Sequence, residues 1–197
     1  MVPGLTSAQR RAKNRRHGRK RPHARVRARP VIPGARLKLT RRCLERRFFL
    51  HPDQRLNQLI GYSLGYCLKK HGLQLHAACF MSNHYHLDVT DPHGNLTEFK
   101  AQFNGLLARA GNALRGRSDR FWSSDPACDV TILDDDDMVS RMAYTIANPT
   151  IGGLVRHAHL WPGFTTAGMR FGERRVYKQP DFFFDPQARR PARRDRA

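Results

Sequence analysis

Two histidines separated by one residue give this chain a candidate pair of metal ligands. His84 and His86 lie in the run His-Tyr-His-Leu-Asp-Val-Thr at 84–90, in which apolar residues occupy every second position. That alternation predicts a β-strand with both imidazoles on one face of a sheet. They are either ligands of one metal ion or a pair of solvent-facing, hydrogen-bonded histidines. A second pair, His157 and His159, lies between a Gly-Gly and a Trp-Pro-Gly sequence, which predicts a loop instead.

A phenol and a carboxamide lie four residues apart later in the chain, at Tyr144 and Asn148. Val139, Met142 and Ile146 repeat with helical period, which predicts a helix with Tyr144 and Asn148 on one face. Tyr144 lies far from this apolar stripe, so it is either a reactive phenol or an ordinary surface tyrosine. If its face meets the histidine face, three metal ligands surround a phenol. Such a combination can cut a nucleic-acid strand through a phosphotyrosine.

The charge of the chain favours a polyanionic partner. The 197 residues carry a formal net charge of +20, and 15 of the 36 Lys and Arg residues fall within the first 42. Residues 1–34 are predicted to form a disordered basic arm, residues 35–165 one domain, and residues 166–197 a basic tail. An arm that only aids solubility is the alternative. No apolar run of spanning length accompanies the charge, so no membrane partner is expected.

The elements that must position these motifs follow the order strand, helix, strand, strand, helix, strand, helix. Hairpin connections dominate, so the predicted fold class is α+β, with an antiparallel sheet and helices packed on it. Asn95 is predicted to cap the second helix, and Pro149 to end the third helix at Asn148. The predicted segments are strands at 35–40, 73–80, 84–90 and 130–133 and helices at 56–68, 95–114 and 134–147.

The cysteines show no Cys-x-x-Cys spacing, which argues against a zinc knuckle. Cys67 is predicted to lie on the apolar face of a helix. Cys79 is predicted in a strand, on one face with Leu75 and Ala77, where a free thiol acts as a small hydrophobe. With no signal peptide in the sequence, the reducing cytosol is the expected compartment. The four cysteines are Cys43, Cys67, Cys79 and Cys128.

Two motifs in matching order resemble the single-tyrosine HUH transposases of the insertion sequence 200-like family. Met-Ser-Asn-His-Tyr-His-Leu at 81–87 is similar to the HUH motif of that family. The sequence at 144–155, with Asn-Pro four residues after the tyrosine and then Gly-Leu-Val, resembles the tyrosine helix of the REP-associated branch. Arg-Phe-Trp at 120–122 and Trp-Pro at 161–162 are also similar to this branch, and the resemblance covers roughly residues 35–165.

The resemblance implies a metal-dependent enzyme that nicks and rejoins single-stranded DNA, near a hairpin, through a 5′-phosphotyrosine intermediate. Tyr144 would be the nucleophile, and His84, His86 and Asn148 would hold Mg²⁺ or Mn²⁺. The sheet would be ferredoxin-like with the histidines on a central strand. The protein would act on DNA in the bacterial nucleoid. Its site would be built within a monomer, as in the REP-associated branch, or across a homodimer, as in the wider family.

Asp88 departs from the family, which usually has an apolar residue at this place. The two-residue period of a strand puts its carboxylate on the histidine face. It is a further ligand, a partner that orients His86, or the mark of a site that has drifted. A carboxylate that simply reaches solvent at the end of the strand is the remaining interpretation.

Basic side chains near the motifs are predicted to bind DNA phosphates without sequence preference. Trp122 is predicted either to stack on an unpaired base or to belong to the core. The residues assigned to DNA binding are Arg36, Lys38, Arg41, Arg42, Arg120, Trp122 and Arg141.

Two other functions fit parts of the sequence. A domesticated relative would be a non-catalytic protein that binds nucleic acid without cutting it. A metal-dependent phosphodiesterase would cut with water and leave no protein on the DNA. The tyrosine transposase is the function most strongly indicated, because the resemblance covers both motifs.

Overall fold

The computed structural model describes residues 32–125, 127–181 and 183. The basic arm predicted over residues 1–34 lies outside this range except for residues 32–34, and so does the end of the predicted tail from residue 184 on. Of the helices in the described part of the chain, none combines the length and the apolar character that crossing a bilayer requires.

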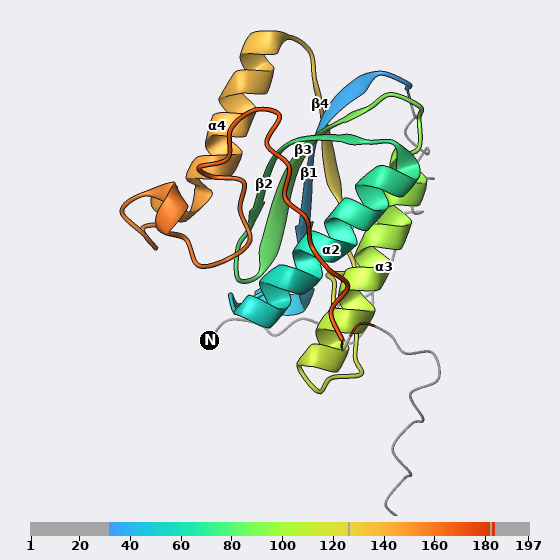
Figure 1. The fold of residues 1–197 in the computed structure, drawn as a ribbon, viewed down its shortest axis with the longest axis vertical. Helices are drawn as coiled ribbons and strands as arrows, with labels where there is room; N and C mark the ends of the chain where they lie inside the picture. Colours follow the sequence, from blue (N-terminus) through green and yellow to red (C-terminus); the bar gives the residue numbers. More distant parts are fainter. Residues whose placement is uncertain (1–31, 126, 182, 184–197) are drawn as a thin grey trace, which may run out of the picture. The chain divides into compact units, whose positions relative to one another are not determined.

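Four antiparallel strands form one sheet in the spatial order β2-β3-β1-β4. Together with the helices between them they give the βαββαβ arrangement of a ferredoxin-like fold, as predicted. The strand that carries the histidines, β3, is central (Figure 1). The strands are β1 (Ala35–Arg42), β2 (Gln74–Phe80), β3 (His84–Asp91) and β4 (Cys128–Ile132).

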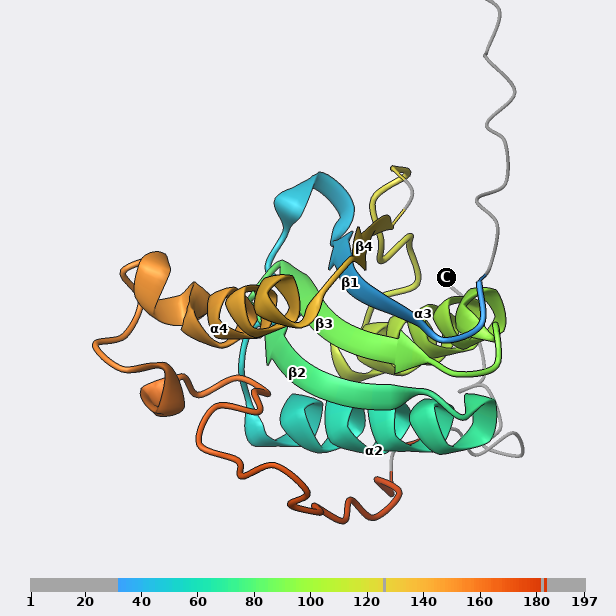
Figure 2. The same cartoon turned by 90° about the horizontal axis from the view of Figure 1, so that it is seen from above.

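Three helices cover the two faces of the sheet. In Figure 2, α2 (Gln54–His71) and α3 (Leu96–Leu114) lie side by side along one face, while α4 (Asp135–Ile151) lies on the other. Two short 3-10 turns, η1 (Leu44–Arg46) and η2 (Ala158–Leu160), complete the elements of the described residues. The sheet thus separates two different helix interfaces.

The main core lies between the sheet and the α2–α3 pair. Tyr85, Leu87 and Val89, the alternate residues of β3 between and beyond the histidines, are fully buried there. Phe99 and Phe103 of α3 stack against each other beneath them, with ring centroids 5.6 Å apart. The predicted alternation of β3 is therefore confirmed, and it leaves the histidines on the α4 side.

Two local predictions in this half of the fold are wrong. Asn95 does not cap α3 through its side chain. Instead the carboxylate of Asp91, at the end of β3, accepts backbone N–H bonds from the turn and from Leu96. In β2, a bulge between Leu75 and Ala77 reverses the alternation. Cys79 therefore lies on the α4 side, while Leu75 packs against the main core.

The tyrosine helix was predicted to end at Asn148. It continues instead through Pro149 to Ile151. Proline removes one helical N–H, and near the end of a helix this loss breaks a single bond. Asn148 therefore keeps helical geometry one turn after Tyr144. Of the predicted apolar stripe, Met142 and Ile146 are half-buried, but Val139 is 66% exposed, so its place in the stripe is wrong. The buried positions of α4 are Met138, Thr145 and Pro149.

The described part of the predicted tail packs on the domain. Phe80 of β2 donates its N–H to the carbonyl of Phe164 at 2.9 Å, and Thr166 donates to the carbonyl of Ala78. Further on, the Tyr177 ring lies against Gly61 of α2, where any side chain would collide with it. Residues 164–177 therefore form a strap along the outer edge of β2 and over α2.

All four cysteines are free, including Cys67 and Cys79, for which free thiols were predicted. Burial raises the pKa of Cys43 and of Cys79 to about 12, and that of Cys67 to about 11. These three thiols are therefore protonated and act as small apolar side chains.

Candidate active site

The strands β1 and β3 bring their even-numbered residues together on the α4 side of the sheet. Directly opposed side chains in an antiparallel pair have Cβ atoms about 5 Å apart, so β1 supplies immediate neighbours to both histidines. The opposed pairs are Arg42 with His84, Thr40 with His86, and Lys38 with Asp88.

Both imidazoles are held through Nδ1, which leaves Nε2 for a metal ion. Nδ1 of His86 lies 2.9 Å from the Thr40 hydroxyl, and Nδ1 of His84 lies 2.6 Å from Oδ1 of Asn83. Asn83 donates Nδ2 to the carbonyl of Arg46 at 3.1 Å, so its Oδ1 faces His84 and must accept a hydrogen bond. His84 therefore carries its proton on Nδ1, with the Nε2 lone pair available.

Burial keeps both histidines neutral. Burial first, and then the nearby His84, Lys38 and Arg42, lower the pKa of His86 to about 3. Burial, followed by the charge of Arg42, also lowers the pKa of His84. The two rings lie edge to face with centroids 4.9 Å apart. Neutral imidazoles at this separation are in the form that binds a metal.

The helix α4 brings Tyr144 to the histidines of its own chain. The ring centroids of Tyr144 and His86 are 6.0 Å apart, edge to face. The tyrosine side chain is 49% exposed, so the phenol remains open to a substrate. Asn148, one turn further, donates Nδ2 to the carbonyl of Tyr144 at 3.1 Å, and its side chain also forms a hydrogen bond with His86.

These donors fit a divalent cation. Within the described residues no three His, Cys, Asp or Glu side chains converge. Asn148, which forms a hydrogen bond with His86, therefore stays the predicted third ligand beside His84 and His86. Two neutral imidazoles and one amide oxygen form a mixed set that suits Mn²⁺ or Mg²⁺, with open positions for a phosphate.

Asp88 lies beneath this site in a buried polar cluster. Its carboxylate is fully buried and lies 3.4 Å from Nζ of Lys38. Lys38 also bonds the hydroxyl of Thr145 and the backbone carbonyl of Arg141, both on α4. The interpretation of Asp88 as a solvent-facing carboxylate is therefore wrong. The group that holds Nδ1 of His86 is Thr40, not Asp88.

The cluster of Lys38, Asp88 and Thr145 ties the tyrosine helix to the sheet. Burial lowers the pKa of Lys38, against the attraction of Asp88. Burial likewise raises the pKa of Asp88, against hydrogen bonds from Thr145 and the charge of Lys38. Nζ of Lys38 lies 5.1 Å from the centre of the Tyr144 ring. The ammonium therefore contacts both the nucleophile candidate and the sheet below it.

Two of the residues predicted to bind DNA are buried. Lys38 is 8% exposed, and its ammonium is turned toward the Asp88 cluster rather than toward solvent. Trp122 is 7% exposed and donates its indole N–H to the carbonyl of Asn104 at 2.9 Å. The prediction of direct DNA contact is corrected for both residues, since neither offers a free surface to a phosphate or a base.

The five predicted arginines are not gathered in one place. Arg42 is exposed and lies directly opposite His84. Arg141, about one turn before Tyr144, pairs with Asp137 at 2.8 Å. These two flank the site. The others lie away from it: Arg36 pairs with Asp135 at the start of α4, Arg41 donates to the carbonyl of Ser123, and Arg120 is exposed after α3.

Sequence reasoning missed three residues that hold the site in place, namely Thr40, Asn83 and Thr145. Asn83 directly precedes the first histidine, and Thr40 continues the alternate positions of Arg36 and Lys38 in the predicted strand at 35–40, so both positions carried a signal. Thr145 carried none, because the helical period of its neighbours pointed to Val139 rather than to a polar residue. The second histidine pair, His157 and His159, lies in the loop region after α4, as predicted.

No protein-family model and no curated protein matches the chain. Among solved structures, the chain is similar to a REP-associated tyrosine transposase bound to a REP hairpin. The two share 20% identity over 79% of this chain and 91% of that one, with a TM-score of 0.57. A protein from Deinococcus radiodurans R1 that has been proposed to be a transposase gives 16% identity, a TM-score of 0.42, and coverage of 61% and 95%.

The comparison and the sheet topology together show the fold class of this chain. The chain has the α+β fold of a REP-associated tyrosine transposase, as the two motifs in its sequence predicted.

Proposed function

We propose that this chain is a transposase that nicks and rejoins single-stranded DNA, with Tyr144 as the nucleophile. The observation that carries the proposal is the 6.0 Å separation between the rings of Tyr144 and His86 within one chain. The transposase with the similar fold binds a REP hairpin, which supports single-stranded DNA with a neighbouring hairpin as the partner. A site complete within one chain supports action as a monomer.

The proposed reaction exchanges one phosphodiester for another. The phenolic oxygen of Tyr144 attacks the phosphorus, and the bond from phosphorus to the 3′-oxygen breaks. The phenolic proton leaves, and the departing oxygen takes up a proton to become a free 3′-hydroxyl. The DNA 5′-phosphate is then esterified to the tyrosine. Because one ester bond replaces another, a 3′-hydroxyl from a second strand reverses the step without a nucleotide cofactor.

The side chains around the phenol have separate tasks in this scheme. His84, His86 and Asn148 would hold a divalent ion, Mg²⁺ or Mn²⁺, which when bound supplies Lewis-acid polarisation of the scissile phosphate. Thr40 and Asn83 keep the imidazoles oriented, through Nδ1.

The basic side chains beside the site support phosphate binding. Arg42 and Arg141 lie on either side of the histidines and the tyrosine, on different elements, so they can contact phosphates on both sides of the cut. The net charge of +20 adds attraction that does not depend on sequence. Binding should therefore weaken steeply as the salt concentration rises.

The test is formation of a covalent adduct that survives denaturation. The purified protein is incubated with hairpin-bearing single-stranded DNA and Mn²⁺, and the products are separated under denaturing conditions. Wild type is expected to give a protein–DNA band, and Tyr144→Phe none. Tyr66→Phe is the matched control, because Tyr66 is 44% exposed on α2, away from the histidines, and should form the adduct normally.

Two other outcomes would overturn the proposal. Cleavage that persists in Tyr144→Phe with no adduct would identify a water-dependent phosphodiesterase. Tight, salt-sensitive binding with no cleavage, unchanged by His84→Ala, would identify a non-catalytic DNA-binding protein. The proposal requires that His84→Ala bind DNA but form no adduct.

A further inference from the structure

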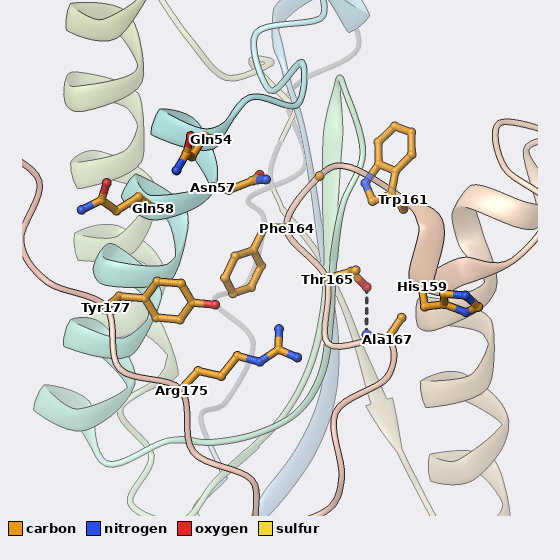
Figure 3. A pocket seen from close by; sticks show the side chains of 11 residues that line it. Gln54, Asn57, Gln58, His159, Trp161, Phe164, Thr165, Ala167, Arg175 and Tyr177 are labelled. Atoms are coloured by element: carbon orange, nitrogen blue, oxygen red, sulfur yellow. Dashed lines mark hydrogen bonds between the residues drawn. The ribbon is translucent and has the colours of Figure 1, made fainter.

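A cavity of about 530 Å³ lies at the outer edge of the sheet, between the start of α2 and the strap (Figure 3). Its volume falls within the range of small-ligand sites. Polar side chains line it unusually densely for a gap between packed elements. Its walls include Gln54, Asn57 and Gln58 from α2, Trp161 after η2, and Arg175 and Tyr177 from the strap.

The cavity is one strand away from the histidines. Cys79 of β2 is the register partner of His86 on β3. On its other side Cys79 forms a bridge with Thr165, and Thr165 lines the cavity. Adjacent strands lie about 4.8 Å apart, so the cavity wall is about 10 Å from the backbone of His86. A nucleotide that flanks a phosphate held at the histidines can reach it.

The amides of α2 give the cavity the chemistry that reads the edge of a base. Each glutamine amide offers two donors and an acceptor. Asn57 donates Nδ2 to the carbonyl of Pro162 at 2.7 Å, which leaves Oδ1 for another partner. That oxygen is shielded from solvent and has no hydrogen-bond partner among the described residues. A buried acceptor without a donor is costly, so a ligand that supplies an N–H group is favoured.

The opposite wall adds an aromatic ring and a positive charge. In Figure 3 the hydroxyl end of Tyr177 and the guanidinium of Arg175 both point toward the middle of the cavity, beside Phe164. Arg175 pairs with Glu173 through Nε at 3.3 Å, and both side chains are well exposed. An exposed pair of this kind is weak, so a phosphate can displace the carboxylate. Aromatic rings and guanidinium groups are also the usual surfaces for unpaired bases.

We propose that this cavity binds one unpaired base of the DNA strand held at the active site, and that it prefers a base with an exocyclic amino group. Cytosine, adenine and guanine carry such a donor, whereas the exocyclic groups of thymine are carbonyls and a methyl group. The inference deepens the proposed function, and it rests on that function in placing the DNA strand at the histidines. It gives the chain a sequence preference in the single-stranded flank of its substrate, next to the cut.

The test is an abasic scan of the flank, read as binding affinity. The probe is a labelled DNA hairpin with a single-stranded flank, in which each flank position is made abasic in turn. Binding is measured with Tyr144→Phe, so that cutting does not interfere. One position is expected to lose about tenfold in affinity, the size of one stacked base. At that position thymine should bind more weakly than cytosine.

The same scan is repeated on a Gln54→Ala/Gln58→Ala variant, in the Tyr144→Phe background. Gln54 is exposed and Gln58 is half-buried, so neither belongs to the core and the fold should be retained, which the unfolding temperature checks. The position-specific loss should disappear, because the contact is already gone. Gln74→Ala is the matched control, since Gln74 is exposed at the start of β2 outside this cavity, and its profile should equal that of the parent.

A flat abasic profile in the parent, or a profile that the glutamine variant leaves unchanged, would overturn the proposal. These results are distinct from failure of the proposed function. If wild type forms no adduct but the parent scan shows the expected loss, the nuclease proposal is wrong and the base site stands. If the adduct forms and the scan is flat, the base site is wrong.

Discussion

The same sheet presents two unlike faces, although both are buried. On one side Leu87 and its neighbours pack against α2 and α3 in an apolar core. On the other, Lys38, His86 and Asp88 lie under α4, and Asp88 is as completely buried as Leu87. Alternate residues of one strand therefore serve two purposes. One set holds the domain together, and the other positions reactive groups.

The two faces differ in how burial affects the free energy of folding. A fully buried aliphatic or aromatic side chain contributes about 1.5–3 kcal/mol on the apolar face. A buried ion pair such as Lys38 with Asp88 loses about as much in desolvation as it gains in attraction. The α4 face therefore adds little net stability for its area. What it adds is directional contact, which fixes where Tyr144 lies relative to the histidines.

The largest expected effect is on the apolar face. Phe99→Ala removes a fully buried ring that stacks on Phe103, and it should lower the free energy of unfolding by about 3–5 kcal/mol. Denaturant unfolding measures the change. Adduct formation per folded molecule should stay the same, because the site is on the other face. A loss of adduct formation in fully folded protein would contradict the view that the apolar face contributes only to stability.

The next effect concerns the buried ion pair. Lys38→Met alone leaves the Asp88 carboxylate buried without its partner and should cost about 3–5 kcal/mol of stability. The double variant Lys38→Met/Asp88→Leu should recover most of that stability, because no unpaired charge remains. Its rate of adduct formation should nevertheless fall about a hundredfold, since small displacements of a nucleophile have effects of this size.

The double variant separates the two roles of the pair, because its stability should recover while its rate of adduct formation stays low. Unfolding measurements and single-turnover adduct formation are made on the same preparations. Affinity for the hairpin DNA serves as the control and should be unchanged. A double variant that is both stable and fully active would show that the pair is structural only.

A smaller effect is expected from pH. The pKa of His86 is about 3 in the folded protein, whereas an unfolded histidine has its ordinary value of about 6.5. Between these values the unfolded chain binds a proton that the folded chain does not, so stability is lost as the pH falls below about 6.5. From pH 7.5 to pH 5.5 the loss attributable to His86 is about 1 kcal/mol.

This pH dependence is measured as the difference between wild type and His86→Gln. Glutamine does not titrate, so the variant should lose less stability over the same interval. Equal slopes in the two proteins would show that His86 titrates in the folded protein as it does in the unfolded chain, and would contradict the lowered pKa of the buried imidazole.

The smallest effect is expected on the outer side of α4. Val139 was predicted to belong to the apolar stripe but is 66% exposed, so Val139→Ser should change stability by about 0.5 kcal/mol or less. Thermal unfolding measures this change. Thr145→Val, on the buried side of the same helix, should be the more harmful, because Lys38 loses its hydroxyl partner.

The contrast between the faces also explains what could be predicted. Alternation and helical period report apolar burial, so the main core, the strand of the histidines and the order of elements followed from the sequence. The α4 face is held by polar contacts, and no apolar period reports it. The burial predicted for Val139 was therefore wrong, and the burial of Lys38 was missed.

Other errors have local causes that need three-dimensional information. The bulge in β2 reverses which side Cys79 faces, and a bulge leaves no mark in a simple alternation. Asp91 caps α3 from the end of a strand, across a turn. Pro149 was expected to end α4, but its neighbours tolerate a proline in the last turn. That Tyr144 would lie beside the histidines could be predicted because these residues form two short motifs.

The hydrogen bond from Asn148 to the carbonyl of Tyr144 has one more consequence. The phenol of Tyr144 and the amide of Asn148 lie on one helix, one turn apart, so they move together. A tilt or slide of α4 against the sheet would withdraw both from the imidazoles at once. If Tyr144 cuts DNA as proposed, one such movement would switch cutting on or off as a whole.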